Sequence, residues 1–266
     1  MNDILNSISL TGIAASLAKA IDIPPPSKAH PPIDAIGQLV QNHTEHGTVD
    51  RIFMYNPDAV AMWLYQKYTE YYLPMLEHVK LTLPLCTVMP SVTPVCFGTM
   101  YTGAMPEIHG IRSYVKPVIK IDTFFDAMIR AGKKCAIVST EGDSLSQIFL
   151  EREMDYFIYP TVDECTDKAL ELIREDRHDF ILLYNADYDS TMHRHAPEGK
   201  ESLEVLKKNI QVFDTIAKSI HAHWSEHETL LGFAPDHGCH EIDGGLGSHG
   251  LDMPEDLNIL HFYTVI

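Results

Sequence analysis

The sequence predicts a single α/β domain with a mostly parallel central sheet and helices on both of its faces. The chain has 266 residues, enough to bury one large core. From residue 51 onwards, short apolar runs alternate with amphipathic segments at helical spacing, which is the pattern of repeated strand–helix units. Acidic and imidazole side chains directly follow several of the apolar runs, where open α/β sheets place their ligands.

The first 48 residues form an expected helical segment that is appended to this domain. Apolar residues recur at helical spacing within 2–20, "IPPPSKAHPP" at 23–32 interrupts the pattern, and a second short helix is expected at 33–45. We therefore divide the chain into an appended segment, 1–48, and a single domain without a large cap, 49–266. The role of the segment stays open among packing on the core, covering a site and mediating association into a homo-oligomer.

The elements of 49–266 follow in order along the chain. Short, strongly apolar runs predict strands at 51–56, 133–140, 155–160, 179–186, 228–234 and 257–266. Apolar stripes at helical spacing predict helices at 58–77, 94–103, 122–132, 163–175 and 200–224. We expect Gly132 to close one of these helices and Asp163 to cap the start of another.

Composition narrows the class of protein. Lys+Arg of 20 against Asp+Glu of 37 gives a net charge of −17, which argues against binding a nucleic-acid polymer or an anionic membrane surface. The five cysteines are odd in number and form no CxxC pair, as expected in a reducing compartment. No run of about 18 apolar residues is present. We therefore expect a soluble, cytoplasmic protein.

Candidate ligands for metal ions lie where the predicted strands end. Asp and His without Cys are typical ligands of Zn²⁺ or Mn²⁺. Two such ions, about 4 Å apart, can stabilise the attacking and leaving oxygens of a phosphoryl transfer. After the strands at 51–56, 179–186 and 228–234, and before the strand at 257–266, the candidates are Asp58; Asp187, Asp189, His193 and His195; Asp236, His237 and His240; and His249.

Thr93 is a candidate nucleophile. It precedes Pro94, and proline favours the first turn of a helix, so we expect Thr93 to be the N-cap of the helix at 94–103. Its hydroxyl would then lie at the positive end of the helix dipole, where phosphate also binds. A metal ion bound to that hydroxyl would make it a nucleophile. A role as a capping threonine alone is the alternative.

The chain contains an ordered set of five motifs that resemble those of the alkaline phosphatase superfamily, especially its nucleotide pyrophosphatase/phosphodiesterase-like branch. "TPVCFGTMYTGAMPEIHGI" resembles the nucleophile segment of that branch and places the nucleophile at Thr93. "DYDSTMHRHAPE" resembles its Asp-x-x-x-His motif, which selects Asp189 and His193. "APDHGCH" resembles the Asp-His-Gly motif, and "GSHG" the last ligand. These motifs and the aspartate after the first strand indicate Asp236, His237, His249 and Asp58, although the usual Asp-Gly reads Asp58-Ala59 here.

The resemblance covers residues 50–266 and implies an alkaline phosphatase-like fold, a ligand set and a reaction. It implies two divalent ions, with zinc expected and manganese as the alternative. A threonine-bound phosphoryl intermediate would form by in-line attack and would be hydrolysed by a water activated on the second ion. One ion would be bound by Asp58, Thr93, Asp236 and His237, and the other by Asp189, His193 and His249.

Two departures from the branch bear on the substrate. The chain has Thr93-Pro94-Val95-Cys96 where the branch usually has Thr-Phe-Pro-Asn, and Tyr114 where it commonly has an asparagine that contacts a phosphate oxygen. Arg112 and Lys116 lie close by and are candidates for neutralising the third oxygen of a monoester.

We expect a small phosphorylated substrate, with a phosphodiester or nucleotide pyrophosphate bond preferred. A phosphomonoesterase or phosphonate hydrolase is the alternative enzyme, and a non-catalytic metal-binding protein is the alternative from another class. The missing cap argues against a mutase. The missing Cys/Ser-x-Pro-x-Arg context argues against a sulfatase.

Overall fold

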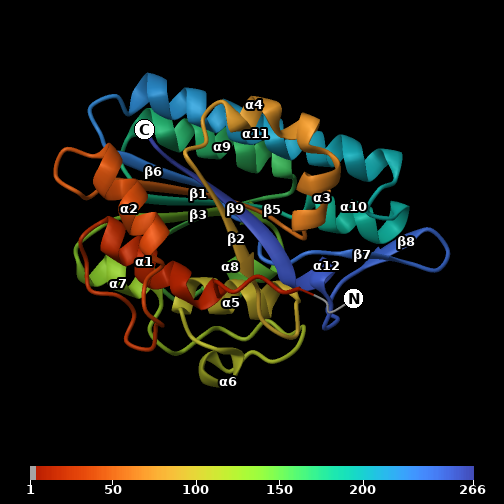
Figure 1. Ribbon diagram of the computed structural model, residues 1–266. Helices are drawn as coiled ribbons and strands as arrows, with labels where there is room; N and C mark the ends of the chain where they lie inside the picture. Colours follow the sequence, from red (N-terminus) through yellow and green to blue (C-terminus); the bar gives the residue numbers. More distant parts are fainter. Residues whose placement is uncertain (1–3) are drawn as a thin grey trace.

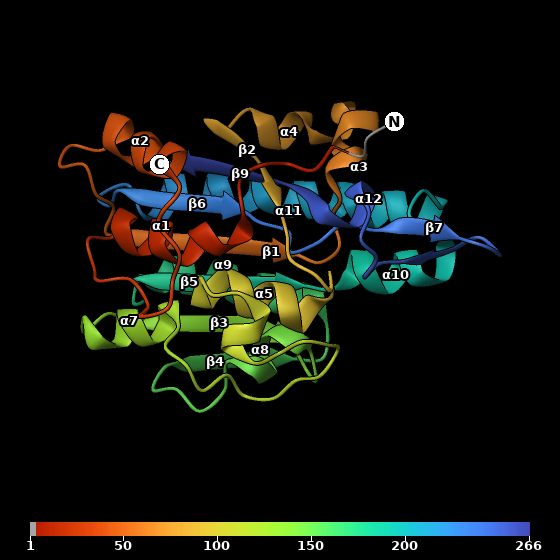
Figure 2. The ribbon, with the colours of Figure 1, turned by 60° about the horizontal axis from the view of Figure 1, so that its bottom comes forward.

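A computed structural model describes residues 4–266 and shows the predicted α/β architecture. Seven strands form one sheet in the order β2-β9-β6-β1-β5-β3-β4 (Figure 2). The pairs β1–β5, β1–β6, β3–β5 and β3–β4 are parallel, and β9 runs antiparallel to both β2 and β6. The strands are β1 (Arg51–Pro57), β2 (Leu81–Cys86), β3 (Cys135–Thr140), β4 (Asp155–Tyr159), β5 (Phe180–Asn185), β6 (Thr229–Phe233) and β9 (Asn258–Val265).

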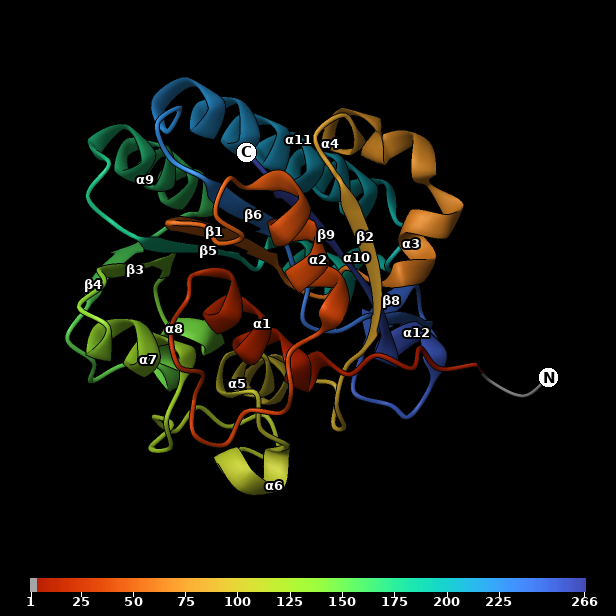
Figure 3. The ribbon, with the colours of Figure 1, turned by 60° about the vertical axis from the view of Figure 1, so that its left-hand side comes forward.

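Helices cover both faces of the sheet (Figures 1 and 3). One face carries α3 (Met62–Lys67), α4 (Leu73–Leu76), α9 (Val162–Glu175) and α11 (Lys200–His223). The other carries α1 (Ile13–Ala20), α2 (Asp34–His43), α5 (Thr93–Thr102), α7 (Phe124–Arg130) and α8 (Ser144–Ile148). Each face has its own apolar core. All residues of β5 are buried, as expected of a central parallel strand with both faces covered.

Most predicted elements are confirmed to within two residues, but the predicted helix at 58–77 is wrong. The helical pattern at 2–20 is confirmed only in part, because among the described residues 4–20 the helix begins at Leu10. Asp58 begins a turn in which Ala59 adopts a left-handed φ of 62°. Beyond it the chain forms α3, a 3₁₀-helix (Thr69–Tyr72) and α4 instead of one helix. Pro74 lies in the first turn of α4, where the missing N–H of proline is tolerated. A proline cannot continue a helix that began earlier in the chain, so one helix over 58–77 is excluded.

Two predicted helix starts are also corrected. Thr161, and not Asp163, caps α9, because its side chain accepts the N–H of Glu164 in a capping box. The N-cap of α5 is Val92, so Thr93 is the first residue inside the helix and its side chain makes no capping hydrogen bond. The prediction that Gly132 closes its helix is confirmed by a left-handed φ of 73° directly after α7.

The strand β2 and a hairpin were not predicted. β2 contains Pro84, and a proline argues against a strand in a sequence-based prediction. Only an edge strand accommodates a proline easily, and β2 lies at an edge of the sheet. The hairpin consists of β7 (His240–Ile242) and β8 (Leu246–Ser248) and extends from the body of the molecule beside α10 (Asp187–His195) (Figures 1 and 2). It is too short for a periodic pattern.

The N-terminal segment packs against α5 and shares its apolar core. Leu10, Ile13 and Leu17 are fully buried in the apolar core that α5 also joins. The Cys86 N–H donates to the Ile8 carbonyl at 2.8 Å, so this segment also lies along the edge strand β2. The division of the chain at residue 48 stays a prediction. Within 4–266, no helix has both the length and the apolar character needed to cross a membrane.

Candidate metal centre

The sheet topology brings the candidate ligands to one edge. The carboxyl ends of β1, β5 and β6 meet there because these strands are parallel. Asp58 follows β1, α10 follows β5, and Asp236 and His237 follow β6. Since β9 is antiparallel, its first residue lies at the same edge, and His249 precedes it by a short connection. Motifs that are far apart in the sequence therefore converge.

Three fully buried residues form what we call the inner site: Asp58, Asp236 and His237. His237 Nε2 lies 3.4 Å from Asp58 Oδ1 and 3.3 Å from Asp236 Oδ2. Both of these carboxylate oxygens are buried without a hydrogen-bond partner. Because buried oxygens without partners are costly, their convergence on an imidazole nitrogen fits a metal ion.

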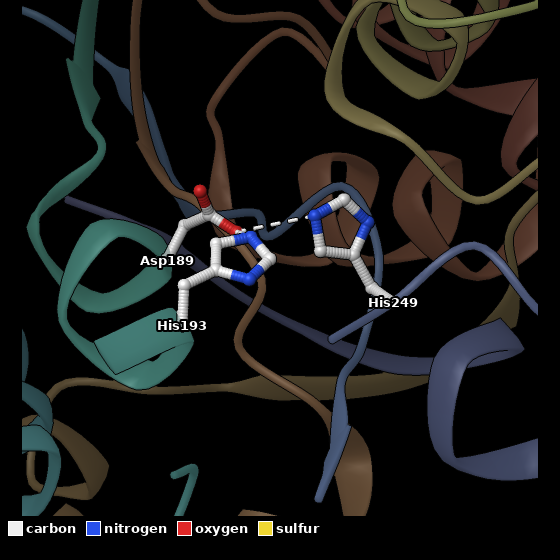
Figure 4. A group of neighbouring side chains, drawn as sticks. All are labelled: Asp189, His193 and His249. Atoms are coloured by element: carbon white, nitrogen blue, oxygen red, sulfur yellow. Dashed lines mark ion pairs between the residues drawn. The ribbon is translucent and has the colours of Figure 1, made fainter. Parts of the chain in front are cut away.

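Three partly buried residues form what we call the outer site: Asp189, His193 and His249 (Figure 4). Asp189 and His193 are one turn apart on α10, and His249 approaches from the opposite side (Figure 4). Asp189 Oδ1 lies 3.2 Å from His193 Nε2 and 3.3 Å from His249 Nε2. The rings of His237 and His249 stack with centroids 4.1 Å apart, so the inner and outer sites adjoin.

Backbone carbonyls orient the three imidazoles. His193 Nδ1 lies 2.9 Å from the Gly247 carbonyl, His237 Nδ1 2.9 Å from that of Gly238, and His249 Nδ1 2.9 Å from that of Ser91. A carbonyl only accepts, so each Nδ1 carries the proton and donates. Each Nε2 is then left with the lone pair that a metal ion requires.

Burial and neighbouring charges shift the pKa values of the inner site. Burial, and then the charge of Asp189, raises the pKa of Asp58 to about 7. Burial also raises the pKa of Asp236 well above its ordinary value, with the charge of Asp58 as the next cause. Burial lowers the pKa of His237 to about 3. These carboxylates lack a compensating positive charge, which a divalent cation would provide.

In the outer site the carboxylate and the imidazoles stabilise each other's charged forms. Although burial opposes it, the adjacent imidazoles of His193 and His249 keep the pKa of Asp189 below its ordinary value. The adjacent carboxylate of Asp189 raises the pKa of His193. Burial alone would lower the pKa of His249, yet Asp189 raises it. One carboxylate with two imidazoles is a common ligand set of a divalent ion such as zinc.

Thr93 lies directly at the inner site. Its hydroxyl donates to Asp58 Oδ2 at 3.2 Å and lies 3.4 Å from His237 Nε2. It is buried at the first position of α5, where the positive end of the helix dipole favours a bound anion. The hydroxyl points at the ligands and makes no cap, which excludes a capping role as the reason for this threonine.

The structure separates the remaining candidates from the two sites. His195 Nδ1 lies 3.9 Å from Glu201 of α11, and His240 Nδ1 lies 2.7 Å from Asp256. Asp187 shares α10 with Asp189 but lines a separate surface pocket of about 370 Å³ between the ends of β3 and β4. The set selected by the motif resemblance is therefore the set that the fold brings together.

The candidate phosphate-binding residues lie on an exposed loop after α6 (Pro106–His109); they are Arg112, Tyr114 and Lys116. Arg112 donates to the Glu107 carbonyl at 3.3 Å, and Lys116 donates to the Gly142 carbonyl at 2.8 Å. The Tyr114 hydroxyl lies 3.4 Å from Ser144 Oγ. Gly142 and Ser144 follow β3, so this loop borders the same edge of the sheet. In the part of the chain that the structure describes, these three residues make no hydrogen bond or ion pair with the ligands.

One residue near the site was missed from the sequence. Tyr184, in β5, donates its hydroxyl to Asp58 Oδ2. We assigned the run "DFILLYNA" to a buried strand, and a tyrosine one residue before the end of such a strand was the available signal. A hydroxyl inside a buried strand needs a partner.

The fold is similar to that of several solved structures. No protein-family model matches the sequence, and neither does any curated protein. Human ectonucleotide pyrophosphatase/phosphodiesterase 5 has a TM-score of 0.60 at 16% identity, over 73% of this chain and 58% of that one. Phosphonoacetate hydrolase from Sinorhizobium meliloti 1021 has a TM-score of 0.52 at 15% identity, over 74% and 59%.

A third similar structure is covered more completely. The C-terminal periplasmic domain of the phosphoethanolamine transferase EptC from Campylobacter jejuni has a TM-score of 0.55 at 12% identity, over 82% of this chain and 80% of that one. The chain thus spans under two thirds of the first two proteins and most of the EptC domain. The predicted fold is confirmed: the chain shares the mostly parallel α/β fold of these three structures.

Proposed function

We propose that the protein is a metal-dependent hydrolase of phosphate esters that cleaves phosphodiester or nucleotide pyrophosphate bonds, with Thr93 as its nucleophile. One observation carries the proposal: the Thr93 hydroxyl contacts Asp58 and lies within 3.4 Å of His237, beside two adjoining clusters of metal-ligand type. A nucleophile next to two such clusters is the arrangement that two-metal phosphoryl transfer requires.

The residues present fit two divalent ions, zinc first and manganese second. Asp58, Asp236, His237 and Thr93 would hold one, and Asp189, His193 and His249 the other. Bound ions would withdraw charge from the phosphate oxygens and lower the pKa of the threonine hydroxyl. The orphaned oxygens of Asp58, Asp189 and Asp236 support this assignment.

The chain's own groups suit a double displacement. Thr93 Oγ1 would attack phosphorus in line with the leaving oxygen, giving up its proton, for which Asp58 Oδ2 is the acceptor within reach at 3.2 Å. The leaving oxygen would take up the proton that Thr93 gave up and depart as the alcohol, and the phosphoryl group would be bound to Thr93. Water would then break the threonine–phosphorus bond, restoring the hydroxyl and releasing the monoester.

Charge favours a diester over a monoester. Between residues 4 and 266 no Lys or Arg forms an ion pair with Asp58, Asp189 or Asp236. A diester carries one negative charge at neutral pH and a monoester carries nearly two. Without a further cation at the centre, the diester is the better match. The solved complex of AMP with an inactive threonine-to-alanine variant of murine ectonucleotide pyrophosphatase/phosphodiesterase 5 supports a nucleotide substrate and a threonine nucleophile.

A phosphonate hydrolase is the second candidate. It is favoured by the similarity to phosphonoacetate hydrolase and by Arg112 and Lys116 on the loop that borders the edge of the sheet. A closure of that loop onto the substrate would supply the cation that the centre lacks.

The deciding experiment compares bis-p-nitrophenyl phosphate, p-nitrophenyl phosphate and phosphonoacetate on one Zn²⁺- or Mn²⁺-loaded sample. We expect the diester to have the highest kcat/KM. A higher value for the monoester or the phosphonate would overturn the diester assignment. Hydrolysis of none of the three, with two ions bound, would contradict the hydrolase itself.

A further inference from the structure

We propose that Tyr184 is a positioning residue for the inner site: its hydroxyl holds Asp58 so that Oδ1 faces the metal ion. This inference depends on the metal centre of the proposed function and concerns ion binding alone. It assigns to a strand residue, which no motif singled out, control over the affinity of one of the two sites.

The register of the sheet places Tyr184 beside Asp58. Tyr184 of β5 is paired with Asn56 of β1, so Asp58 lies two residues further along the neighbouring chain segment, directly after β1. Such a diagonal neighbour is within reach of a long aromatic side chain. The phenol hydroxyl donates to Asp58 Oδ2, and the residue is only 3% exposed. Solvent therefore offers little replacement for this contact.

Packing holds the phenol in place. The ring of Phe97 meets the ring of Tyr184 edge-on, with centroids 5.5 Å apart and planes at 87°. Phe97 lies one turn after Thr93 on α5, so Tyr184 is enclosed between the sheet and the helix that carries the nucleophile. An aromatic ring in such a close-packed interior has little freedom to turn its hydroxyl away.

The two oxygens of Asp58 have different partners. Oδ2 accepts from Tyr184 and from Thr93, whereas Oδ1 has no hydrogen bond and lies 3.4 Å from His237 Nε2. When Thr93 turns towards a metal ion or a phosphorus atom, Tyr184 is the donor that remains on Oδ2. Without it the carboxylate would be free to rotate, and Oδ1 would lose its fixed direction.

The test measures ion affinity, not turnover. Apo protein is titrated with Zn²⁺ against a chromophoric chelator, in the wild type and in Tyr184→Phe, each also in a His193→Ala background that removes one ligand of the outer site. We expect Tyr184→Phe to weaken the inner site by about 10- to 100-fold, the usual effect of losing a group that orients a ligand. The outer site should change by less than about twofold.

Tyr55→Phe is the matched control. Tyr55 is fully buried on the adjacent strand β1, faces the other core, and donates its hydroxyl to Asn209 Oδ1 at 3.2 Å. The same hydroxyl accepts from Asn185 Nδ2 at 2.9 Å, so Tyr55→Phe loses one buried hydroxyl that contacts none of the metal ligands. Thermal unfolding of the apo proteins checks that both variants fold.

Three outcomes would overturn the inference: unchanged affinity in Tyr184→Phe, equal weakening of both sites, or the same weakening in Tyr55→Phe. A wild-type chain that binds no Zn²⁺ would overturn the inference and the metal centre together. If the chain binds two ions and Tyr184→Phe weakens the inner one, yet no phosphate ester is hydrolysed, the inference stands and the proposed function fails.

Discussion

At the scale of single residues, the position of Thr93 leads to the first prediction. Its hydroxyl donates to Asp58 Oδ2 at the inner site. Thr93→Ala should therefore lower kcat by at least about 10³-fold, as for other lost nucleophiles, while the protein still folds and binds metal. Thr102→Ala is the control, because Thr102 is buried on the same helix with its hydroxyl donating to the Gly98 carbonyl. Steady-state kinetics decide, and unchanged turnover in Thr93→Ala would remove Thr93 as nucleophile.

Asp189 and Asp187 provide a matched pair on one helix. Asp189 Oδ1 lies close to both imidazoles of the outer site, whereas Asp187 faces the pocket on the other side of α10. Asp189→Ala should bind about one ion fewer per chain, because the outer site keeps only two ligands. Asp187→Ala should keep the full complement. Metal analysis of the dialysed proteins measures this, and equal metal content in the two variants would refute the outer-site assignment.

At the scale of elements, His109 connects α6 to α5. Its Nδ1 accepts the Ile111 N–H at 3.3 Å, its Nε2 lies 3.0 Å from Thr99 Oγ1, and its ring packs against Gly98. A side chain at residue 98 would clash with that ring, since an added Cβ would lie 2.9 Å from Cε1. The neutral imidazole of His109 therefore packs against α5, the helix that carries Thr93.

Because His109 packs in its neutral form, the stability of the protein depends on pH. Burial lowers the pKa of His109 to about 4, below the value of about 6.5 in the unfolded chain. The unfolded state thus binds the proton more readily, so stability falls as the pH drops from about 6.5 towards 4. The loss at pH 4.5 should be about 2 to 3 kcal/mol.

His109→Gln isolates this contribution. The variant has no imidazole to protonate, so its free energy of unfolding should lie closest to that of the wild type at pH 4.5 and furthest below it at pH 7. Urea unfolding of the metal-free proteins at both pH values tests this. A gap that is equal at both pH values would show that His109 does not carry the effect.

At the scale of the whole molecule, His227 lies at the opposite end of the strands, where β1 and β6 begin. Its effect on stability has the opposite dependence on pH. His227 Nδ1 lies 2.5 Å from Asp50 Oδ2, and its Nε2 lies 2.9 Å from Asp176 Oδ2. It links the start of β1 to the end of α9. Burial opposes the charged form, but the two carboxylates outweigh it and raise the pKa of His227.

The sign follows from the raised pKa. The contribution of His227 to stability is complete below about pH 6.5 and is lost as the pH rises through the higher pKa of the folded state. His227→Gln should therefore destabilise the protein more at pH 6 than at pH 9. Urea midpoints at the two pH values measure the difference, and a larger cost at pH 9 would reverse our assignment of the charged form.

The N-terminal segment yields a prediction about the whole fold. Leu10, Ile13 and Leu17 are fully buried. Removing them loses the burial of three such side chains, worth about 5 to 9 kcal/mol, and exposes the core surface that they cover. The loss is comparable to the whole stability of a typical domain. A chain consisting of 49–266 alone should therefore fail to fold. Circular dichroism and a cooperative melting transition would reveal the contrary, which would make 49–266 an independent domain.

Much of this fold follows from local patterns. The run "DFILLYNA" is continuously apolar, and the apolar stripe of α11 is long and periodic, so both segments specify their structure by local pattern. β2 was missed because Pro84 argues against a strand unless the strand lies at an edge, and position in the sheet depends on distant pairing. The helix expected at 58–77 was wrong because Asp58 serves a turn at the edge of the sheet and because Pro74, a local signal that the prediction did not use, begins a separate helix.

The sequence by itself determined the alternation of strands and helices and the order of the motifs, because both depend on residues that are neighbours along the chain. Only the tertiary structure decided that β9 runs antiparallel, which brings His249 to the edge where β1, β5 and β6 end. It also decided that Tyr184 meets Asp58, 126 residues away. These contacts join residues far apart in the sequence, and only the assembled sheet sets the distance between them.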